Sequence, residues 1–223
     1  MAILTVDNVS FTYQNKFQTV RAVRDVSCCF QYGRCYAIVG KSGSGKTTLL
    51  SMLAGLELPT EGCVLYDGKS TAEMNRDEYR RDHAAVIYQS YNLFPLLTAE
   101  ENVLYPMKLK KRNRAEARER ARKELLAVGI DESKFRRFPS QLSGGEQQRI
   151  AIARALAAGN QIILADEPTG NLDITNSEQV IQILLRLAHD EGRCVIIVTH
   201  DLEIAAQTDE VWLMRDGQLE RDT

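Results

Sequence analysis

The residues with the clearest chemistry lie in the stretch VGKSGSGKTTLL, at positions 39–50. Within it, GKSGSGKT fits the spacing G-x-x-x-x-G-K-[ST], whose glycines let successive backbone N–H groups point at one phosphate. The Lys46 ammonium can reach the β- and γ-phosphates of a nucleotide, and the Thr47 hydroxyl is a suitable ligand for Mg²⁺. The pattern predicts a phosphate-binding loop, with a glycine- and serine-rich surface turn as the alternative. The residues expected to contact the nucleotide here are Gly40, Lys41, Ser42, Gly43, Ser44, Gly45, Lys46, Thr47 and Thr48.

Two carboxylates follow a predicted buried strand at residues 161–165. Successive side chains of a strand point to opposite faces, so Asp166 and Glu167 are expected to do so as well. In phosphate-transferring enzymes one such carboxylate serves Mg²⁺ and its neighbour polarises the attacking water. An exposed carboxylate pair without a ligand is the alternative.

Polar side chains also end two other predicted strands. Gln89 follows the apolar run at 85–88, and His200 comes shortly after the run at 193–198. In open α/β sheets ligands collect outside the carboxyl ends of the strands, where the phosphate loop and Asp166 also fall. Gln89 is therefore expected to ligate Mg²⁺ or water, and His200 to belong to the same site. A capping glutamine and a structural histidine are the alternatives.

A second glycine-rich helix start lies at residues 141–149, with the sequence QLSGGEQQR. Ser143 supplies a hydroxyl, Gly144 and Gly145 leave backbone N–H groups uncovered, and the helix that follows adds its dipole. Two such helix starts in one chain are expected to face the same nucleotide from opposite sides. A helix cap without a ligand is the alternative.

The elements that position these residues follow from the spacing of apolar side chains. Residues 3–9 and 22–30 alternate apolar and polar positions, as antiparallel strands do, with a polar turn expected at 14–16. Tyr13 lies near that turn, where an aromatic ring can stack on a nucleobase or pack as an ordinary tyrosine. The other expected elements are strands at 35–39 and 63–66, helices at 47–56, 74–83 and 175–189, and a hairpin at 211–220.

Residues 90–159 differ in character and are expected to form an inserted helical subdomain, with approximate bounds 91–158. Pro95 and Pro106 are expected to bound a first helix, and residues 108–129 to form a second. Glutamates are interleaved with the many basic residues at 108–123, which favours a solvated helix face over nucleic-acid contact, because no aromatic residues are available for base stacking.

Composition sets the class of protein. A chain of 223 residues, 44% hydrophobic and 26% charged, suits one large globular domain. The net charge of −2 gives no overall basic field, so no nucleic-acid partner is expected. No apolar run approaches the ~18 residues needed to cross a bilayer. The cysteines form no C-x-x-C pair and are expected to be buried, reduced thiols in the cytosol; they are Cys28, Cys29, Cys35, Cys63 and Cys194.

Taken together, the motifs GKSGSGKTT, Gln89, LSGGEQQR, ILADEP, the Asp173 turn and His200 occur in the order found in ABC-type ATPases, which the chain resembles over essentially its whole length. The resemblance implies an α/β fold, the P-loop NTPase of ABC type. Its mixed sheet core carries an N-terminal antiparallel β subdomain and an inserted helical subdomain, in a single domain spanning residues 1–223.

The same resemblance implies roles for individual residues. Asp166 would end the Walker B strand as a metal ligand, with Glu167 as the catalytic carboxylate and His200 as a switch. Tyr13 would stack on the base. The chain would form a head-to-tail homodimer when ATP is bound, so that Ser143 and Gly145, in the signature at residues 142–149, meet the γ-phosphate held by the partner's loop. The remaining implied nucleotide-binding residues are Ser143, Gly144, Gly145 and Asp173.

Within this family, the strings PTGNLD and NLFPLLTAEENV resemble the subgroup of lipoprotein-releasing, macrolide-exporting and antimicrobial-peptide-exporting ATPases, which also includes a cell-division ATPase. The resemblance implies a subunit that hydrolyses ATP to power a permease on separate chains, at the cytoplasmic face of the cell membrane. A regulator of cell division or cell-wall enzymes is the alternative. An apolar cluster is expected either to dock a permease helix or to pack within the subdomain; it consists of Leu93, Phe94, Leu96 and Leu97.

Overall fold

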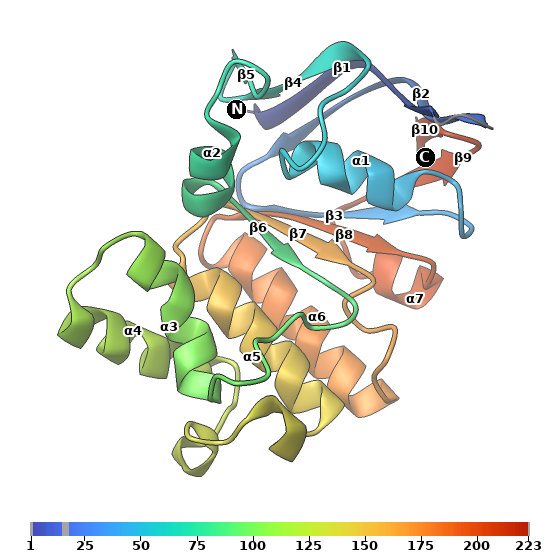
Figure 1. The fold of residues 1–223 in the computed structure, drawn as a ribbon. Helices are drawn as coiled ribbons and strands as arrows, with labels where there is room; N and C mark the ends of the chain where they lie inside the picture. The colour runs from blue at the N-terminus through green and yellow to red at the C-terminus, as the bar shows by residue number, and fades with distance from the viewer. Residues whose placement is uncertain (1, 15–17, 223) are drawn as a thin grey trace.

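Two sheets form the framework of the molecule. The computed structural model describes residues 2–14 and 18–222 (Figure 1). The first sheet is antiparallel, in the order β2-β1-β4-β5. Its strands are β1 Ala2–Gln14, β2 Thr19–Gln31, β4 Glu61–Tyr66 and β5 Lys69–Ser70. β1 and β2 are longer than their apolar alternation predicts, and residues 15 and 16 of the expected turn lie outside the described residues.

The second sheet is mixed, in the order β10-β9-β3-β8-β7-β6. Its strands are β3 Arg34–Val39, β6 Ala84–Ile87, β7 Ile162–Asp166, β8 Cys194–Thr199, β9 Glu210–Arg215 and β10 Gln218–Arg221. β6, β7, β8, β3 and β9 pair in parallel, and β10 pairs antiparallel with β9 as the expected hairpin. Because parallel strands end at one edge, the segments after β3, β6, β7 and β8 meet there.

The helices cover both faces of the mixed sheet. They are α1 Lys46–Leu53, α2 Arg76–Asp82, α3 Ala99–Leu109, α4 Arg114–Ala127, α5 Gly144–Ala157, α6 Ile174–His189 and α7 Leu202–Ala205, with short 3-10 helices at Glu132–Lys134 and Pro139–Gln141. α1 lies between the two sheets, while α5 and α6 lie against the opposite face and α3 and α4 lie beyond α5 (Figure 1).

β8 is apolar from Cys194 to Val198, as is typical of a parallel strand buried on both faces, and ends in the buried Thr199. Cys194, Ile196 and Val198 pack into the core that contains α1 and the antiparallel sheet. Val195 and Ile197 pack into the second core, with α5 and α6. The mixed sheet is thus packed on both faces, and this packing fixes the position of the edge where its parallel strands end. That edge carries the candidate site.

Two helix boundaries expected between residues 95 and 129 were wrong, whereas the helix expected at 175–189 is confirmed as α6. α3 continues through Pro106 to the end of its last turn, where a missing backbone N–H costs one helical bond. The expected helix at 108–129 does not start at 108, because Lys111 has a left-handed φ of 52°. Asn113 then caps α4, accepting a hydrogen bond from the Ala115 N–H at 2.8 Å.

The cysteines are free thiols, as expected, but they are not all buried. Cys35 and Cys194 are fully buried, and burial raises the pKa of the Cys194 thiol to about 12. Cys28 and Cys63 are half-buried, and Cys29 is exposed because neighbouring side chains of β2 face opposite sides. Among the residues that the structure describes, no helix is long and apolar enough to cross a bilayer.

Candidate nucleotide-binding site

A cavity of about 780 Å³ opens at the edge of the mixed sheet where the parallel strands end. The antiparallel sheet, the phosphate loop and the segments after β6, β7 and β8 all contribute to its wall. Its lining residues are Tyr13, Val20, Ala22, Lys41, Ser42, Gly43, Gly45, Lys46, Thr47, Thr48, Gln89, Asp166, Glu167 and His200. The residues predicted to be catalytic or metal-binding are thus brought together from four separate stretches of the chain.

The phosphate loop connects β3 to α1 and requires glycine where it meets β2. Gly45 has a left-handed φ of 106°, and a Cβ atom there would lie 2.2 Å from the carbonyl oxygen of Ala22. The Lys46 side chain folds back over the loop, and its Nζ donates to the carbonyl oxygens of Gly40 at 2.8 Å and Lys41 at 3.1 Å. Lys46 is only 7% exposed, so its charge is directed into the cavity wall rather than into solvent.

The β9–β10 hairpin supports the loop from behind. The Gly217 N–H donates to the Ser44 carbonyl at 3.0 Å, and the Gly217 carbonyl accepts from the Arg24 N–H of β2 at 2.8 Å. A Cβ atom on Gly40 would lie 2.3 Å from the carbonyl oxygen of Met214. Gly40 and Ser44 line a neighbouring cavity of about 750 Å³ on this side of the loop.

The two carboxylates share the cavity, which corrects the expectation that they point to opposite faces. Asp166 ends β7, but Glu167 has a left-handed φ of 46° and so leaves the strand. Two backbone hydrogen bonds hold this turn, from Glu167 N–H to the Val198 carbonyl at 2.9 Å and from Gly170 N–H to the Glu167 carbonyl at 3.1 Å. His200 Nδ1 lies 2.9 Å from Glu167 Oε2, so the imidazole orients this carboxylate.

Oxygen ligands suited to Mg²⁺ gather beside the loop. The Thr47 hydroxyl donates to Asp166 Oδ1 at 3.3 Å. Burial raises the pKa of Asp166, and the neighbouring Glu167 charge adds to this, while the Thr47 hydrogen bond opposes it. The backbone of Gln89 is held by Asn171, whose Nδ2 donates to the Gln89 backbone carbonyl at 3.2 Å. Hydroxyl, carboxylate and amide oxygens are the donors that Mg²⁺ prefers, so these residues fit such an ion.

Tyr13 forms part of the cavity wall. Its ring is 49% exposed and packs edge-on against Phe11, with centroids 4.8 Å apart. Its hydroxyl lies 3.3 Å from Thr48 Oγ1. Val20 pairs with Tyr13 across the β1–β2 ladder and joins it in the wall. We did not predict Val20 or Ala22 as lining residues, although their alternation in β2 opposite Tyr13 was a usable signal.

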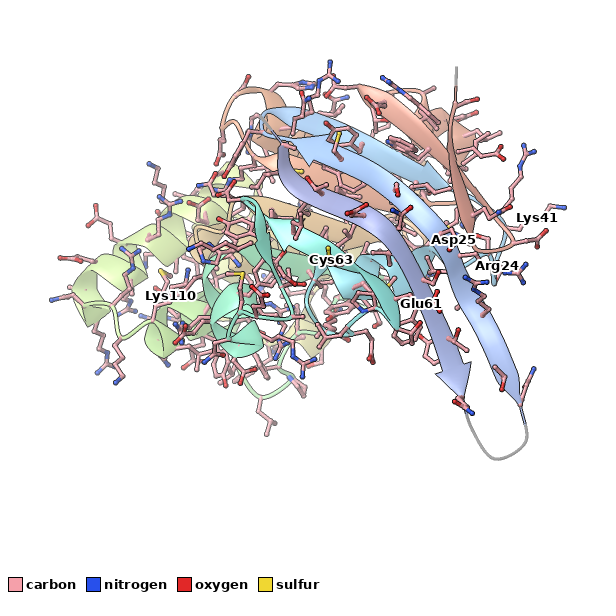
Figure 2. The ribbon with its side chains drawn as sticks, turned by 90° about the horizontal axis from the view of Figure 1, so that it is seen from above. Arg24, Asp25, Lys41, Glu61, Cys63 and Lys110 are labelled. Atoms are coloured by element: carbon pink, nitrogen blue, oxygen red, sulfur yellow. The ribbon has the colours of Figure 1, made fainter. Side chains whose placement is uncertain are left out.

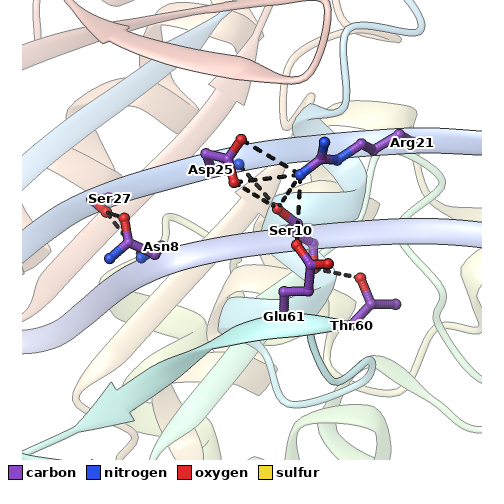
Figure 3. A network of polar contacts seen from close by, with 7 residues as sticks. All are labelled: Asn8, Ser10, Arg21, Asp25, Ser27, Thr60 and Glu61. Atoms are coloured by element: carbon purple, nitrogen blue, oxygen red, sulfur yellow. Dashed lines mark hydrogen bonds and ion pairs between the residues drawn. The ribbon is translucent and has the colours of Figure 1, made fainter.

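A polar network pins the strands that carry this wall (Figure 3). Ser10 Oγ accepts hydrogen bonds from Arg21 Nη2 at 3.0 Å and from the Asp25 backbone N–H at 3.1 Å. Arg21 also lies near the carboxylates of Asp25 and Glu61, at 3.3 and 3.6 Å. Asp25 and Glu61 belong to β2 and β4, the strands on either side of β1 (Figure 2). The network thus joins β1, β2 and β4, the strands beside and including the one that carries Tyr13.

The second glycine-rich helix start is not among the described residues that line this cavity. Ser143 caps α5, where its hydroxyl accepts from the Glu146 N–H at 3.3 Å and its own N–H donates to Glu146 Oε2 at 2.8 Å. Asp173 caps α6 in the same way, accepting from the Asn176 N–H at 2.9 Å. Within one chain, therefore, Ser143, Gly144, Gly145 and Asp173 do not face the nucleotide cavity.

The apolar cluster after Gln89 is divided between surface and core. Leu96 is 87% exposed and Phe94 is 40% exposed, whereas Leu93 packs against the helical core. Phe94 lines a groove of about 360 Å³ together with Tyr105 and Leu109 of α3. Of the cluster, only Phe94 is among the described residues that line this groove, which is largely apolar.

A phosphate loop between a parallel strand and a helix, with carboxylates at the end of a parallel strand two positions away in the same sheet, defines a P-loop nucleoside triphosphatase. The chain belongs to the ABC transporter family, since the family model described as ABC transporter matches residues 23–170. The uncharacterized ABC transporter ATP-binding protein YclH of Bacillus subtilis (strain 168) is 41% identical over 209 residues, 94% of this chain and 92% of that protein. The uncharacterized ABC transporter ATP-binding protein MJ0796 of Methanocaldococcus jannaschii is 40% identical over 226 residues, covering 99% of this chain and 96% of that protein.

Solved structures agree with this assignment. The dimeric structure of a post-hydrolysis state of the MJ0796 cassette, bound to ADP and Pi, has a TM-score of 0.91 at 38% identity, and the match covers 99% of this chain and 97% of that chain. cbiO1 from Clostridium perfringens, part of the ABC transporter complex cbiONQ, has a TM-score of 0.87 at 26% identity, covering 98% and 87%. The expected α/β fold of ABC type is confirmed, and the chain is an ATP-binding ABC ATPase.

Proposed function

We propose that the chain is the ATP-hydrolysing subunit of a membrane transporter of the export or lipoprotein-release type, acting at the cytoplasmic face of the cell membrane through a permease on separate chains. The observation that carries this proposal is an apolar groove next to Gln89, a residue of the nucleotide cavity. We further propose that residues 1–223 act as one ATP-binding domain, with the helical subdomain at about 91–158.

In this proposal the loop amides and Lys46 bind the phosphates, and Tyr13 stacks on the base. Thr47, Gln89 and Asp166 would hold Mg²⁺, which when bound neutralises charge on the phosphates. Glu167 accepts the proton of the attacking water as the water oxygen bonds to the γ-phosphorus and the bond from that phosphorus to the bridging oxygen breaks, releasing ADP. His200, at 2.9 Å from the Glu167 carboxylate, keeps that acceptor oriented.

The signature residues and Asp173 would act on the nucleotide of a second copy of the chain in a head-to-tail homodimer. Two features support this. Ser143 and Asp173 begin helices α5 and α6 outside their own chain's nucleotide cavity, with helix N-terminal N–H groups available to an anion. The similar cassette of MJ0796 is dimeric in its post-hydrolysis structure.

The permease contact is proposed at the apolar groove that contains Phe94 and Tyr105, whose rings lie 4.6 Å apart. A short amphipathic helix fits a groove of this kind. The similar cbiO1 is part of an ABC transporter complex, which supports a subunit role.

Phe94→Asp tests this role in the cell that makes the protein. The variant should lose co-purification with its membrane partner, because a carboxylate in an apolar groove costs several kcal/mol of binding, on the order of 2–5. Leu126→Asp is the matched control, since Leu126 is 50% exposed on α4 and is not a described groove residue. Retained co-purification of Phe94→Asp would contradict the docking role, and loss of its circular dichroism signal would support a packing role instead. Sequencing the captured partner separates a permease from a cell-division protein.

A further inference from the structure

The segment after Gln89 has an unusual backbone. Tyr91 and Asn92 both adopt left-handed conformations, with φ values of 62° and 46°. Asparagine tolerates this region, but a bulky residue such as tyrosine adopts it only where surrounding contacts impose it. Such imposed conformations cluster at switch regions and ligand clamps, so the contacts that impose this one are informative.

Arg154, near the end of α5, supplies those contacts. Its Nη1 donates to the Asn92 carbonyl at 2.6 Å, and its Nη2 donates to the Tyr91 carbonyl at 3.0 Å. The planar guanidinium thus holds two consecutive carbonyls through two different nitrogens, a fork that the single ammonium nitrogen of a lysine lacks. The same group lies 5.9 Å from the centre of the Phe94 ring, within the range of a cation–π contact.

The clamped segment is also fixed at both of its ends. Asn171 Nδ2 donates to the Gln89 carbonyl at 3.2 Å. At the other end, buried Asn102 of α3 accepts from the Phe94 N–H at 2.8 Å and donates to the Phe94 carbonyl at 3.2 Å. Arg154 therefore holds the middle of a short strap that runs from the nucleotide cavity to the apolar groove, and it lines that groove itself.

We propose that Arg154 is a positioning residue for Gln89: its grip on the Tyr91 and Asn92 carbonyls sets where the Gln89 side chain lies in the nucleotide cavity. The inference rests on the proposed role of Gln89 as a ligand of Mg²⁺ or water. Without Arg154 the left-handed pair relaxes, and the Gln89 amide, two residues away, shifts with it. Misplacement of a ligand at a reacting centre lowers turnover without preventing substrate binding.

The test uses the purified full chain with Arg154→Gln, Gln89→Ala and the double variant. Arg154→Gln should lower kcat about tenfold or more, with the KM for ATP changed by no more than about twofold. The kcat of the double variant should be no lower than that of Gln89→Ala alone, because Arg154 acts by placing the Gln89 side chain, which is already absent in Gln89→Ala. Hydrogen exchange of the Tyr91 and Asn92 amides should rise in Arg154→Gln without nucleotide.

Arg186→Gln is the matched control. Arg186 of α6 also donates to a backbone carbonyl, that of Ala127 at 2.9 Å, but this contact joins α6 to α4 and does not involve the segment after Gln89. Arg186→Gln should leave kcat unchanged. If Arg154→Gln does not fold, Arg154→Lys takes its place and should show an intermediate kcat, because a single ammonium nitrogen lacks the planar two-nitrogen fork and holds the two carbonyls less rigidly. A wild-type kcat in that variant would overturn the proposal.

The remaining outcomes separate the two levels of inference. Suppose that Gln89→Ala lowers kcat, and that adding Arg154→Gln lowers kcat further, by the same factor as Arg154→Gln does in the wild-type chain. Arg154 then acts independently of Gln89 and the proposal fails. If Gln89→Ala alone leaves kcat unchanged, the proposed role of Gln89 itself fails. A loss of ATP affinity equal to the loss of kcat in Arg154→Gln would assign Arg154 a structural role only.

Discussion

Replacing Gly45 by alanine should destabilise the nucleotide-free chain more than the same change at Gly43. Both glycines have left-handed φ values, 106° and 79°, at which an alanine costs about 1–2 kcal/mol. Both changes also reduce the conformational entropy of the unfolded chain, which stabilises the folded protein by about 0.4–1 kcal/mol in each case. These contributions therefore largely cancel when the two variants are compared.

The difference between the variants comes from what the new methyl group meets. At Gly43 it meets no described atom within 4 Å. At Gly45 it would lie 2.2 Å from the Ala22 carbonyl oxygen, which belongs to the backbone of β2 and cannot rotate away. Moving β2 away from the loop is a form of overpacking, which costs about 1–3 kcal/mol. Gly45→Ala should therefore be less stable than Gly43→Ala by about this amount.

Urea unfolding followed by circular dichroism, without nucleotide, measures this difference. Gly45→Ala should also bind a fluorescent ATP analogue more weakly, because Ala22 and Gly45 both line the nucleotide cavity. Equal unfolding free energies for the two variants would refute the reasoning, since they would show that β2 does not press on the loop at Gly45.

Four further predictions test the site and the framework. Glu167→Gln should retain ATP binding and lose about 10²–10⁴-fold in turnover, as measured by steady-state ATPase, because an amide is a poor proton acceptor. Lys46→Ala should weaken binding of a fluorescent ATP analogue far more than Tyr13→Ala, whose stacking contributes about 1–3 kcal/mol, and Tyr13→Phe should be nearly silent. Mixed dimers of Lys46→Ala and Ser143→Arg chains, with Glu167→Gln in both, should trap one ATP, and trapping of none would mean that Ser143 acts within its own chain. Burial raises the pKa of Asp209, but the hydrogen bonds it accepts from a backbone N–H and a histidine outweigh this and leave the pKa lowered. Asp209→Asn should therefore lower stability at pH 7, by about 1 kcal/mol, and the difference should begin to shrink as the pH falls below about 4 and vanish only below the lowered pKa of Asp209 in the folded protein; a difference that persists in stronger acid would contradict this.

The sequence by itself determined the phosphate loop and which strands end at the site. Gly40 to Thr48 is a local motif, and its strand and helix context lies within a few residues, so the elements at 35–39 and 47–56 could be predicted from apolar spacing alone. Gln89, Asp166 and His200 could be placed at one edge because parallel strands end together. The helix ends at 106–113 could not, because a proline in a last turn and a left-handed lysine leave no periodic signal.

Only the tertiary structure decided which side chains share the cavity. Glu167 joins Asp166 there because a hydrogen bond to Val198, a residue of the neighbouring strand, supports its left-handed turn. Arg154 grips the segment after Gln89 from 62 residues further along the chain. These contacts join residues that are distant in sequence, and each depends on how the sheets and helices pack, so no local pattern in the amino-acid sequence encodes them.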